Sequence, residues 1–339
     1  MKAVIAIDSF KGCMSSDTAA HAVARGLDGV QCTVLPVSDG GEGFMEIVSG
    51  AMKATIRTVR VHDPLGRMID ARYGLKGATA IIESAAASGL NLMSEDERNP
   101  LAATTRGTGE MIADAIRSGA RNIYIGLGGT GTNDGGKGML EALEGIDLTG
   151  CTFHGLCDVS TVFCGPEGAS YVFGPQKGAG KEMVEILDRR LNRIAEEYLA
   201  KSGRDVLTKK GSGAAGGLGG AIWAMLGGEL LPGAEAVLDL LEFEKALEGA
   251  SVVITGEGRM DRQTLQGKLP FTVASRARKY DSRIKVMAFT GSNLLSGEDH
   301  PFDEIIQITP EGTPMELAMS EAYAVGRLSE CASASLICF

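Results

Sequence analysis

Acidic and basic side chains gather where the short apolar runs of this sequence end. The first run is followed by Asp8, Ser9 and Lys11, and the second by Asp39. Open α/β sheets bind ligands beyond the carboxyl ends of their strands. A carboxylate there can orient a hydroxyl group and accept its proton, and a lysine can hold a phosphate or a carboxylate. The alternative at each place is a helix-capping acid with an exposed lysine, and it stays open for either motif alone.

The richest segment is GLGGTGTNDGGKGML, residues 126–140, between an apolar run and a helical pattern. A strand, a glycine loop and a helix in this order aim backbone N–H groups at an anion, usually a phosphate. We expect the phosphate to meet the loop at Gly128, Gly129, Thr130 and Thr132. The next two side chains, Asn133 and Asp134, suit a hydroxylated substrate or a Mg²⁺ ion carried by that phosphate.

Further polar segments have the same character. Residues 104–109 contain Arg106, and residues 173–179 contain Gln176 and Lys177. The segment 213–220, GAAGGLGG, is a second candidate phosphate cradle through Gly216 and Gly217, although close helix packing explains it equally well. A helix cap explains 104–109 equally well.

The last such segment, residues 253–270, leaves a predicted strand and enters a loop with Glu257, Asp261 and Lys268. So many ionisable residues in one glycine loop indicate a ligand site rather than a solvated connector. Asp158 lies between the central glycine loop and residues 173–179 and is a further candidate acid.

Several enzyme classes are excluded by what the sequence lacks. It has no GxxxxGK[ST] phosphate loop, no GxGxxG after its first strand, and no histidine beside an obvious nucleophile. The remaining acids, lysines and glycine loops are the ingredients of Mg²⁺-assisted phosphoryl transfer.

The elements that must position these residues alternate between strand and helix. Apolar runs predict strands at 2–7, 32–37, 78–83, 122–126, 251–255, 285–290 and 303–309, and a hairpin at 55–61 and 68–74. Helical patterns predict helices at 15–27, 43–52, 108–118, 181–200, 214–226, 237–246, 271–280 and from 314 onward. This pattern is typical of an α/β fold with a largely parallel sheet. The less regular middle predicts an inserted α/β domain at 61–249 within a discontinuous domain of 1–60 plus 250–339.

Composition limits the partners. The chain has 339 residues and a formal net charge of −10, which argues against nucleic acid and anionic membranes. No apolar stretch is long enough for a membrane span, and the N-terminal run is too short for a signal peptide. Seven unevenly spaced cysteines indicate free thiols in a reduced cytoplasm.

Six segments together resemble the bacterial glycerate kinase type-1 family, and they occur in that family's order over essentially the whole chain. They are DSFKG (8–12), DGGEG (39–43), GLGGTGTNDGG (126–136), FGPQKGA (173–179), GAAGGLGG (213–220) and TGEGRMDRQTLQGK (255–268). The resemblance implies ATP-dependent, Mg²⁺-assisted phosphorylation of D-glycerate, with 2-phosphoglycerate as the product. It also implies two domains, one Rossmann- or flavodoxin-like, with the active site in the cleft between them, and a homodimer is an open alternative to a monomer.

The residues named above take hypothetical roles under this reading. Catalytic roles are predicted for Asp8, Lys11, Asp39 and Asp158. Substrate or phosphate binding is predicted for Ser9, Arg106, Gly128, Gly129, Thr130, Thr132, Asn133, Gln176, Lys177, Gly216, Gly217 and Lys268. Metal binding is predicted for Asp134, Glu257 and Asp261.

The chain departs from the family at 160–163, where Ser-Thr-Val-Phe replaces a usual Asn-Pro-Leu run. Two alternatives therefore remain. The chain is a kinase for another small hydroxy or sugar acid, or it is a non-catalytic ligand-binding relative.

Overall fold

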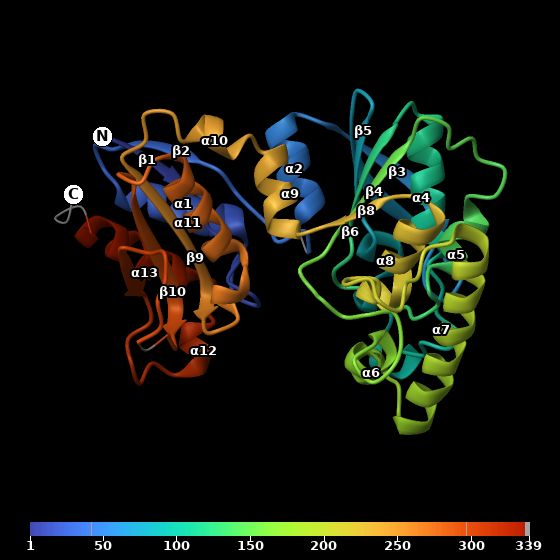
Figure 1. Cartoon of the computed structure of the whole chain (residues 1–339). Coiled ribbons are helices and arrows are strands. Elements are labelled where there is room, and N and C mark those ends of the chain that lie inside the picture. The colour runs from blue at the N-terminus through green and yellow to red at the C-terminus, as the bar shows by residue number, and fades with distance from the viewer. Residues whose placement is uncertain (42, 296, 336–339) are drawn as a thin grey trace. The chain divides into compact units, whose positions relative to one another are not determined.

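The structure of this protein is a computed structural model that describes residues 1–41, 43–295 and 297–335 (Figure 1). Contacts between Cα atoms divide the chain into unit 1, Met1–Asp39 with Ala234–Phe339, and unit 2, Gly40–Gly233. The unit boundaries lie before the expected residues 60 and 250. They do so because helix α2 (Phe44–Met52) packs on strands of unit 2, while Arg276 of unit 1 pairs with Glu235 of helix α9 (Gly233–Leu240) at 3.1 Å.

Unit 1 is built on five strands. They are β1 (Lys2–Ile5), β2 (Gln31–Val34), β9 (Val252–Met260), β10 (Lys285–Asn293) and β11 (Glu304–Gln307). Its helices are α1 (Ser16–Gly26), α9, α10 (Phe243–Ala246), α11 (Leu269–Tyr280), α12 (Met315–Ala318) and α13 (Glu321–Ser335). The spatial order is β11-β10-β9-β1-β2, and all four pairings are parallel.

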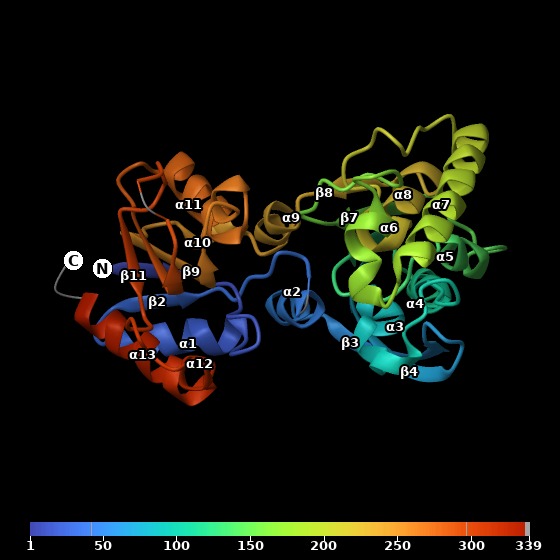
Figure 2. The same cartoon turned by 90° about the horizontal axis from the view of Figure 1, so that it is seen from below.

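This sheet is covered on both faces, as parallel sheets require. Figure 2 shows α1 and α13 below the sheet and α11 above it. Consecutive residues of β1, Ala3, Val4 and Ile5, are fully buried for this reason. Helix α1 approaches α13 so closely that a Cβ atom on Gly26 would lie 2.2 Å from the carbonyl oxygen of Ser329. Only glycine fits at that position.

Unit 2 contains six strands in the order β3-β4-β5-β6-β7-β8. They are β3 (Thr55–His62), β4 (Met68–Lys76), β5 (Thr79–Glu83), β6 (Asn122–Gly126), β7 (Thr152–Leu156) and β8 (Glu229–Leu231). Its helices are α2, α3 (Ala85–Ser88), α4 (Arg106–Arg117), α5 (Lys137–Ala142), α6 (Ala169–Phe173), α7 (Lys181–Ser202) and α8 (Ala214–Met225).

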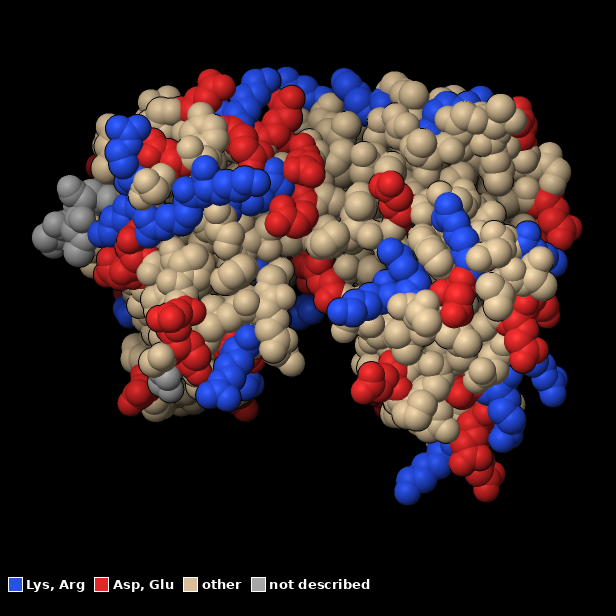
Figure 3. All heavy atoms as spheres, in the orientation of Figure 1, with Lys and Arg blue, Asp and Glu red and all other residues tan. Residues whose placement is uncertain are grey.

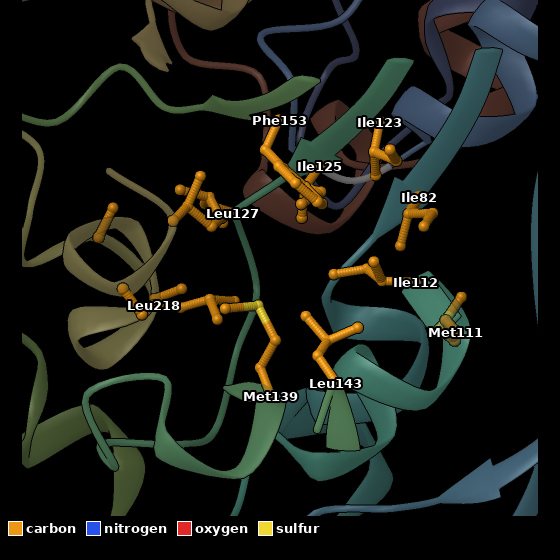
Figure 4. Packing of buried hydrophobic residues seen from close by; sticks show 14 of the residues in the cluster. Ile82, Met111, Ile112, Ile123, Ile125, Leu127, Met139, Leu143, Phe153 and Leu218 are labelled. Atoms are coloured by element: carbon orange, nitrogen blue, oxygen red, sulfur yellow. The ribbon is translucent and has the colours of Figure 1, made fainter. Parts of the chain in front are cut away.

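The first three strands of unit 2 are antiparallel and the last four are parallel. The predicted hairpin is confirmed, since Thr55 pairs with Leu75 and His62 with Met68. One face of the sheet packs on α4, α5, α7 and α8 through a single apolar core. Figure 4 shows part of that core, where Ile125 and Phe153 of the strands face Met139 and Leu218 of the helices.

The described residues include no helix that is both long enough and apolar enough to cross a membrane. Six of the seven cysteines, at positions 13, 32, 151, 157, 164 and 331, are free thiols, and Cys338 lies outside the described residues. The α/β class with parallel sheets, predicted from the sequence, is confirmed.

Candidate active site

The carboxyl edge of the unit 1 sheet carries three acids on or beyond adjacent strands. Asp8 follows β1, Asp39 follows β2, and Glu257 lies in β9 on the other side of β1. The chain runs from β1 to β2 on one side and then crosses to β9 on the other, which gives the flavodoxin-like strand order. The point of reversal lies between β1 and β9, where such sheets bind their ligands. The backbone N–H of Asp8 donates to the carbonyl oxygen of Gly256 at 3.0 Å, which places Asp8 at this point.

Burial and the two neighbouring acids change the acidity of Asp8. Burial and the nearby charges of Asp39 and Glu257 raise the pKa of Asp8 to about 7, although a hydrogen bond from the Ser9 N–H and the charge of Lys11 oppose the shift. A carboxyl group that titrates near neutrality is suited to accept a proton from a substrate hydroxyl, because its proton affinity matches the working pH.

Glu257 is held in a small network with Asp261 and Lys268. Glu257 is only 8% exposed, and the Thr264 hydroxyl donates to its Oε1 at 2.5 Å. The Lys268 ammonium lies 3.7 Å from Glu257 Oε2 and 3.9 Å from Asp261 Oδ1. Burial raises the pKa of Glu257, and Lys268 and the Thr264 bond partly offset that shift.

The backbone at Glu257 differs from the loop that the sequence predicts. Strand β9 continues through Glu257 to Met260, because residues 252–260 pair in register with β10, Glu257 opposite Thr290. The glycines at 256 and 258 do not end the strand, since pairing with a long neighbour outweighs their weak strand preference. The sequence also did not predict Thr264, whose hydroxyl donates to Glu257 and accepts from the Asp261 N–H at 3.0 Å.

The network fits a magnesium ion only in part. Glu257 and Asp261 offer carboxylate oxygens, which Mg²⁺ prefers, and Mg²⁺ usually takes its other ligands from water and substrate phosphates. The described residues contain no group of three or more His, Cys, Asp or Glu side chains arranged to hold a metal. These two acids therefore suit a Mg²⁺ ion that arrives with a phosphate.

In unit 2, hydrogen bonds to the Asp134 carboxylate hold the glycine loop after β6 in place. This side chain is 2% exposed, and its Oδ2 accepts from the Thr105 N–H at 2.8 Å and the Thr105 hydroxyl at 2.9 Å. It also accepts from the N–H groups of Gly136 at 3.0 Å and Gly138 at 3.2 Å. Both carboxylate oxygens accept protein hydrogen bonds, so these contacts favour a structural role for Asp134, and its metal role stays a prediction. Asp134 joins the loop to the start of α4.

Lys177 is a second buried side chain that holds the same loop by a hydrogen bond. Its ammonium donates to the carbonyl oxygen of Thr132 at 2.7 Å, and the side chain is 2% exposed. Burial lowers the pKa of Lys177 to about 8, although Asp134 acts in the opposite direction. Beside it, the Asn133 amide donates to the Ser170 hydroxyl at 2.9 Å. Thr132 Oγ1 and Asn133 Oδ1 are buried and make no hydrogen bond within the described residues.

The segment 213–220 packs against this loop and forms no open cradle. Ala215, Gly216 and Gly217 have left-handed backbone angles that break α8. A Cβ atom on Gly216 would lie 2.1 Å from the carbonyl oxygen of Thr132, and the Gly216 carbonyl accepts from the Gly135 N–H at 3.0 Å. The close-packing alternative therefore describes Gly216 and Gly217 better than phosphate binding.

Only the first two glycines of the sequence-predicted phosphate site are accessible. Gly128 and Gly129 are exposed, while Thr130 is 6% exposed. Gly129 has a φ of +70°, and a Cβ atom on Gly128 would lie 3.0 Å from Gly41. The DGGEG segment thus reaches this loop with its glycines; Glu42 lies outside the described residues.

The four other predicted side chains are exposed, and the structure does not gather them into one cluster. Arg106 is exposed at the start of α4 and donates to Glu110 Oε1 at 3.0 Å, a carboxylate that also contacts His62 Nδ1. Asp158 is exposed and accepts from the Gly233 N–H at 2.7 Å. Exposed side chains are also found at Lys11 of unit 1 and at Gln176, in the short 3₁₀ turn 175–177.

The comparisons with known proteins agree with the motifs. The sequence profile of the Glycerate kinase family matches residues 3–149 and 145–334. The chain is 40% identical to a glycerate kinase of Bacillus subtilis (strain 168), over 95% of this chain and 94% of that protein. It is 42% identical to a glycerate 2-kinase of Escherichia coli (strain K12), with the same two coverages.

A solved structure shows the same fold. A crystal structure described as glycerate kinase 2 from Salmonella typhimurium LT2 superposes with a TM-score of 0.86 at 38% identity, and it covers 100% of this chain and 98% of that one. By sequence and by fold, this chain belongs to the glycerate kinase family.

Proposed function

We propose that this chain transfers the γ-phosphoryl group of ATP to the 2-hydroxyl of D-glycerate and forms 2-phosphoglycerate. The family supports phosphorylation of glycerate, and the relative from Escherichia coli bears the name glycerate 2-kinase. The observation that carries the proposal is Asp8, a carboxyl group with a pKa of about 7 at the reversal point of the unit 1 sheet.

Asp8 is assigned the proton of the reacting hydroxyl. Above its pKa the carboxylate accepts a hydrogen bond from the hydroxyl, and it takes the proton as the bond to phosphorus forms. Asp39 and Glu257 raise the proton affinity of Asp8. Lys11, which is exposed and close enough to act on the charge of Asp8, is assigned the carboxylate of glycerate. Ser9 holds Asp8 in place through its N–H at 2.7 Å.

Phosphate groups are assigned to two places. Lys268 is 40% exposed beside Glu257 and Asp261 and can neutralise charge on the transferring phosphoryl group. Bound Mg²⁺, when held by Glu257 and Asp261 with the nucleotide, would draw charge from the phosphate oxygens. In unit 2 the exposed backbone at Gly128 and Gly129 is suited to receive phosphate oxygens.

A second candidate function is a kinase for a different small hydroxy acid. The observation that favours it is the altered segment 160–163. Phe163 is fully buried, and the carbonyl oxygen of Thr161 accepts from the Gly213 N–H at 3.0 Å. A changed run at this point would alter how segment 213–220 lies against the glycine loop. The changed position of that loop would then alter which substrate the chain accepts.

A coupled ADP-release assay tests the proposal. The purified chain is supplied with ATP, Mg²⁺ and D-glycerate, beside L-glycerate, tartronate and glycerol, with and without EDTA. ADP release that depends on D-glycerate and is lost with EDTA is the expected result. Turnover of tartronate alone would favour the second candidate. A folded chain that releases no ADP with any of the acids would contradict both.

A further inference from the structure

A hollow on the surface of unit 2 lies outside every residue assigned above. It has a volume of about 500 Å³ and lies between α5 and α7. Its lining includes four basic and two aliphatic side chains: Lys137, Arg189, Arg190, Arg193, Ile186 and Ile194. Glu141 and Glu197 complete its charged groups.

The charge of the hollow is opposite to that of the chain. Four cations against two carboxylates leave a local charge of +2, while the whole sequence carries −10. Figure 3 shows basic and acidic side chains interleaved over the surface where Figure 1 draws α7. Lys137 pairs with Glu197, and Arg189 lies 3.8 Å from Glu185. The structure records no ion pair for Arg193 among the described residues, and Arg190 uses one N–H on the Leu101 carbonyl at 3.0 Å. Guanidinium donors therefore remain available.

The floor of the hollow is fixed before any ligand binds. Ile194 is 4% exposed, and a Cβ atom on Gly135 would lie 3.1 Å from its Cδ1. One turn later the Tyr198 hydroxyl donates to the Gly135 carbonyl at 2.9 Å. A preformed wall lowers the ordering cost of binding. Ile186, in contrast, is 45% exposed and offers an apolar surface at the rim.

We propose that this hollow binds a small organic phosphate with an apolar portion, at a second site separate from the residues assigned to glycerate and ATP. Planar guanidinium groups bind phosphate oxygens in pairs, with geometry that an ammonium cannot match. Arg189 and Arg193 lie one turn apart on α7 and therefore share a face of that helix. The two isoleucines suit the apolar portion of the ligand.

The test uses phenyl phosphate, which joins one phosphate dianion to an apolar ring, and calorimetry with the full chain. The double variant R189Q/R193Q removes two cations from the hollow. The matched control K181Q/K210Q removes two exposed cations of unit 2 outside it, with the same change in net charge. Circular dichroism confirms that both variants fold.

The wild type and the control should bind phenyl phosphate alike, and R189Q/R193Q should bind it at least about tenfold more weakly. Neutral benzyl alcohol should not bind measurably. Equal binding by both variants would place the phosphate elsewhere and overturn the proposal, as would no binding by the wild type up to about 10 mM. Sedimentation adds a further check. A wild-type dimer that R189Q/R193Q dissociates, without phenyl phosphate binding, would make the hollow an interface between copies and would also overturn the proposal.

Discussion

The buried ammonium group of Lys177 donates a hydrogen bond of 2.7 Å to the carbonyl oxygen of Thr132. This bond joins the turn at 175–177 to the middle of the glycine loop, 45 residues earlier in the chain. Because the carbonyl oxygen of Thr132 is also the atom that a Cβ added at Gly216 would meet first, three separate segments meet at one backbone group. The loop owes its shape to these distant partners as much as to its own glycines.

Replacing Lys177 by Met should change how stability depends on pH. The folded-state pKa of Lys177 is lowered to about 8 from an ordinary value of 10.5, so the unfolded chain binds more protons between these values. The free energy of unfolding of the wild type should therefore rise with pH across this window relative to the variant, by about 1–3 kcal/mol. Urea unfolding at pH 7.5 and pH 10 measures the difference.

The exposed Lys201 supplies the control for this prediction. K201M should follow the wild type at both pH values. If K177M also kept the same difference from the wild type at pH 7.5 and pH 10, Lys177 would not be a desolvated cation in the folded chain.

Replacing Asp8 by Asn should lower turnover and raise stability at alkaline pH. Without a carboxylate the substrate hydroxyl has no proton acceptor, and kcat should fall about 10²–10⁴-fold. The raised pKa of Asp8, about 7, means that ionising it costs the folded state stability as pH rises from 3.8 through 7. At pH 8 the Asn variant should gain at least about 1 kcal/mol over the wild type, and at pH 4 almost nothing.

In the wild type the same titration should appear in the kinetics. As pH rises through about 7, Asp8 loses its proton and kcat/KM for glycerate should increase. D28N, a change at an exposed acid of the same unit, should match the wild type in rate and in stability. A flat rate between pH 6 and 8, with D8N as active as D28N, would remove Asp8 from the reaction.

Asp134 and Glu257 should respond differently to the loss of their charge. Asn at 134 leaves donors of Thr105, Gly136 and Gly138 without a charged acceptor, so D134N should lose about 2–4 kcal/mol of stability. Its dependence on Mg²⁺ should stay that of the wild type. E257Q should keep the fold and need more Mg²⁺ for half-maximal rate.

Thermal unfolding measures the stability of both variants, and the reaction rate at increasing Mg²⁺ concentration measures their metal requirement. The roles would be exchanged if D134N proved stable with a raised Mg²⁺ requirement, and E257Q showed wild-type behaviour with the metal.

Replacing Gly216 by Ala should destabilise the chain by more than its backbone angle alone explains. The φ of Gly216 is +66°, and its new methyl group would lie 2.1 Å from the Thr132 carbonyl. Gly227 has a φ of +69° with no atom within 4 Å of an added Cβ atom. G227A should therefore cost only the strain of the left-handed angle, about 1 kcal/mol.

The clash should add about 1–3 kcal/mol in G216A, which chemical denaturation of both variants can resolve. Equal losses would mean that the loop moves aside freely and that segment 213–220 does not support it.

The sequence predicted much of the fold, because most strands are continuous apolar runs between glycine-rich turns. Strands β7 and β8 were not predicted from the sequence. Thr152–Leu156 contains a histidine and a glycine, and Glu229–Leu231 is three residues long. Both are strands because β6 and β7 present edges to pair with, a condition that lies far away in the sequence.

The candidate site was predictable where a local rule places it. Asp8 and Asp39 follow strands β1 and β2, so the strand-end rule places both at the carboxyl edge of the sheet. Asp134 was assigned to a metal, since an acid in a glycine loop looks available. Its hydrogen-bond partner Thr105 is 29 residues away in the sequence, so only the folded structure reveals this contact.

The measurement that bears most directly on the central claim is ³¹P NMR of the product made from ATP and D-glycerate by the wild-type chain. The account predicts the resonance of 2-phosphoglycerate together with ADP, with neither formed when D-glycerate or the chain is left out. A resonance of 3-phosphoglycerate, or ADP with inorganic phosphate and no phosphoester, would contradict transfer to the 2-hydroxyl.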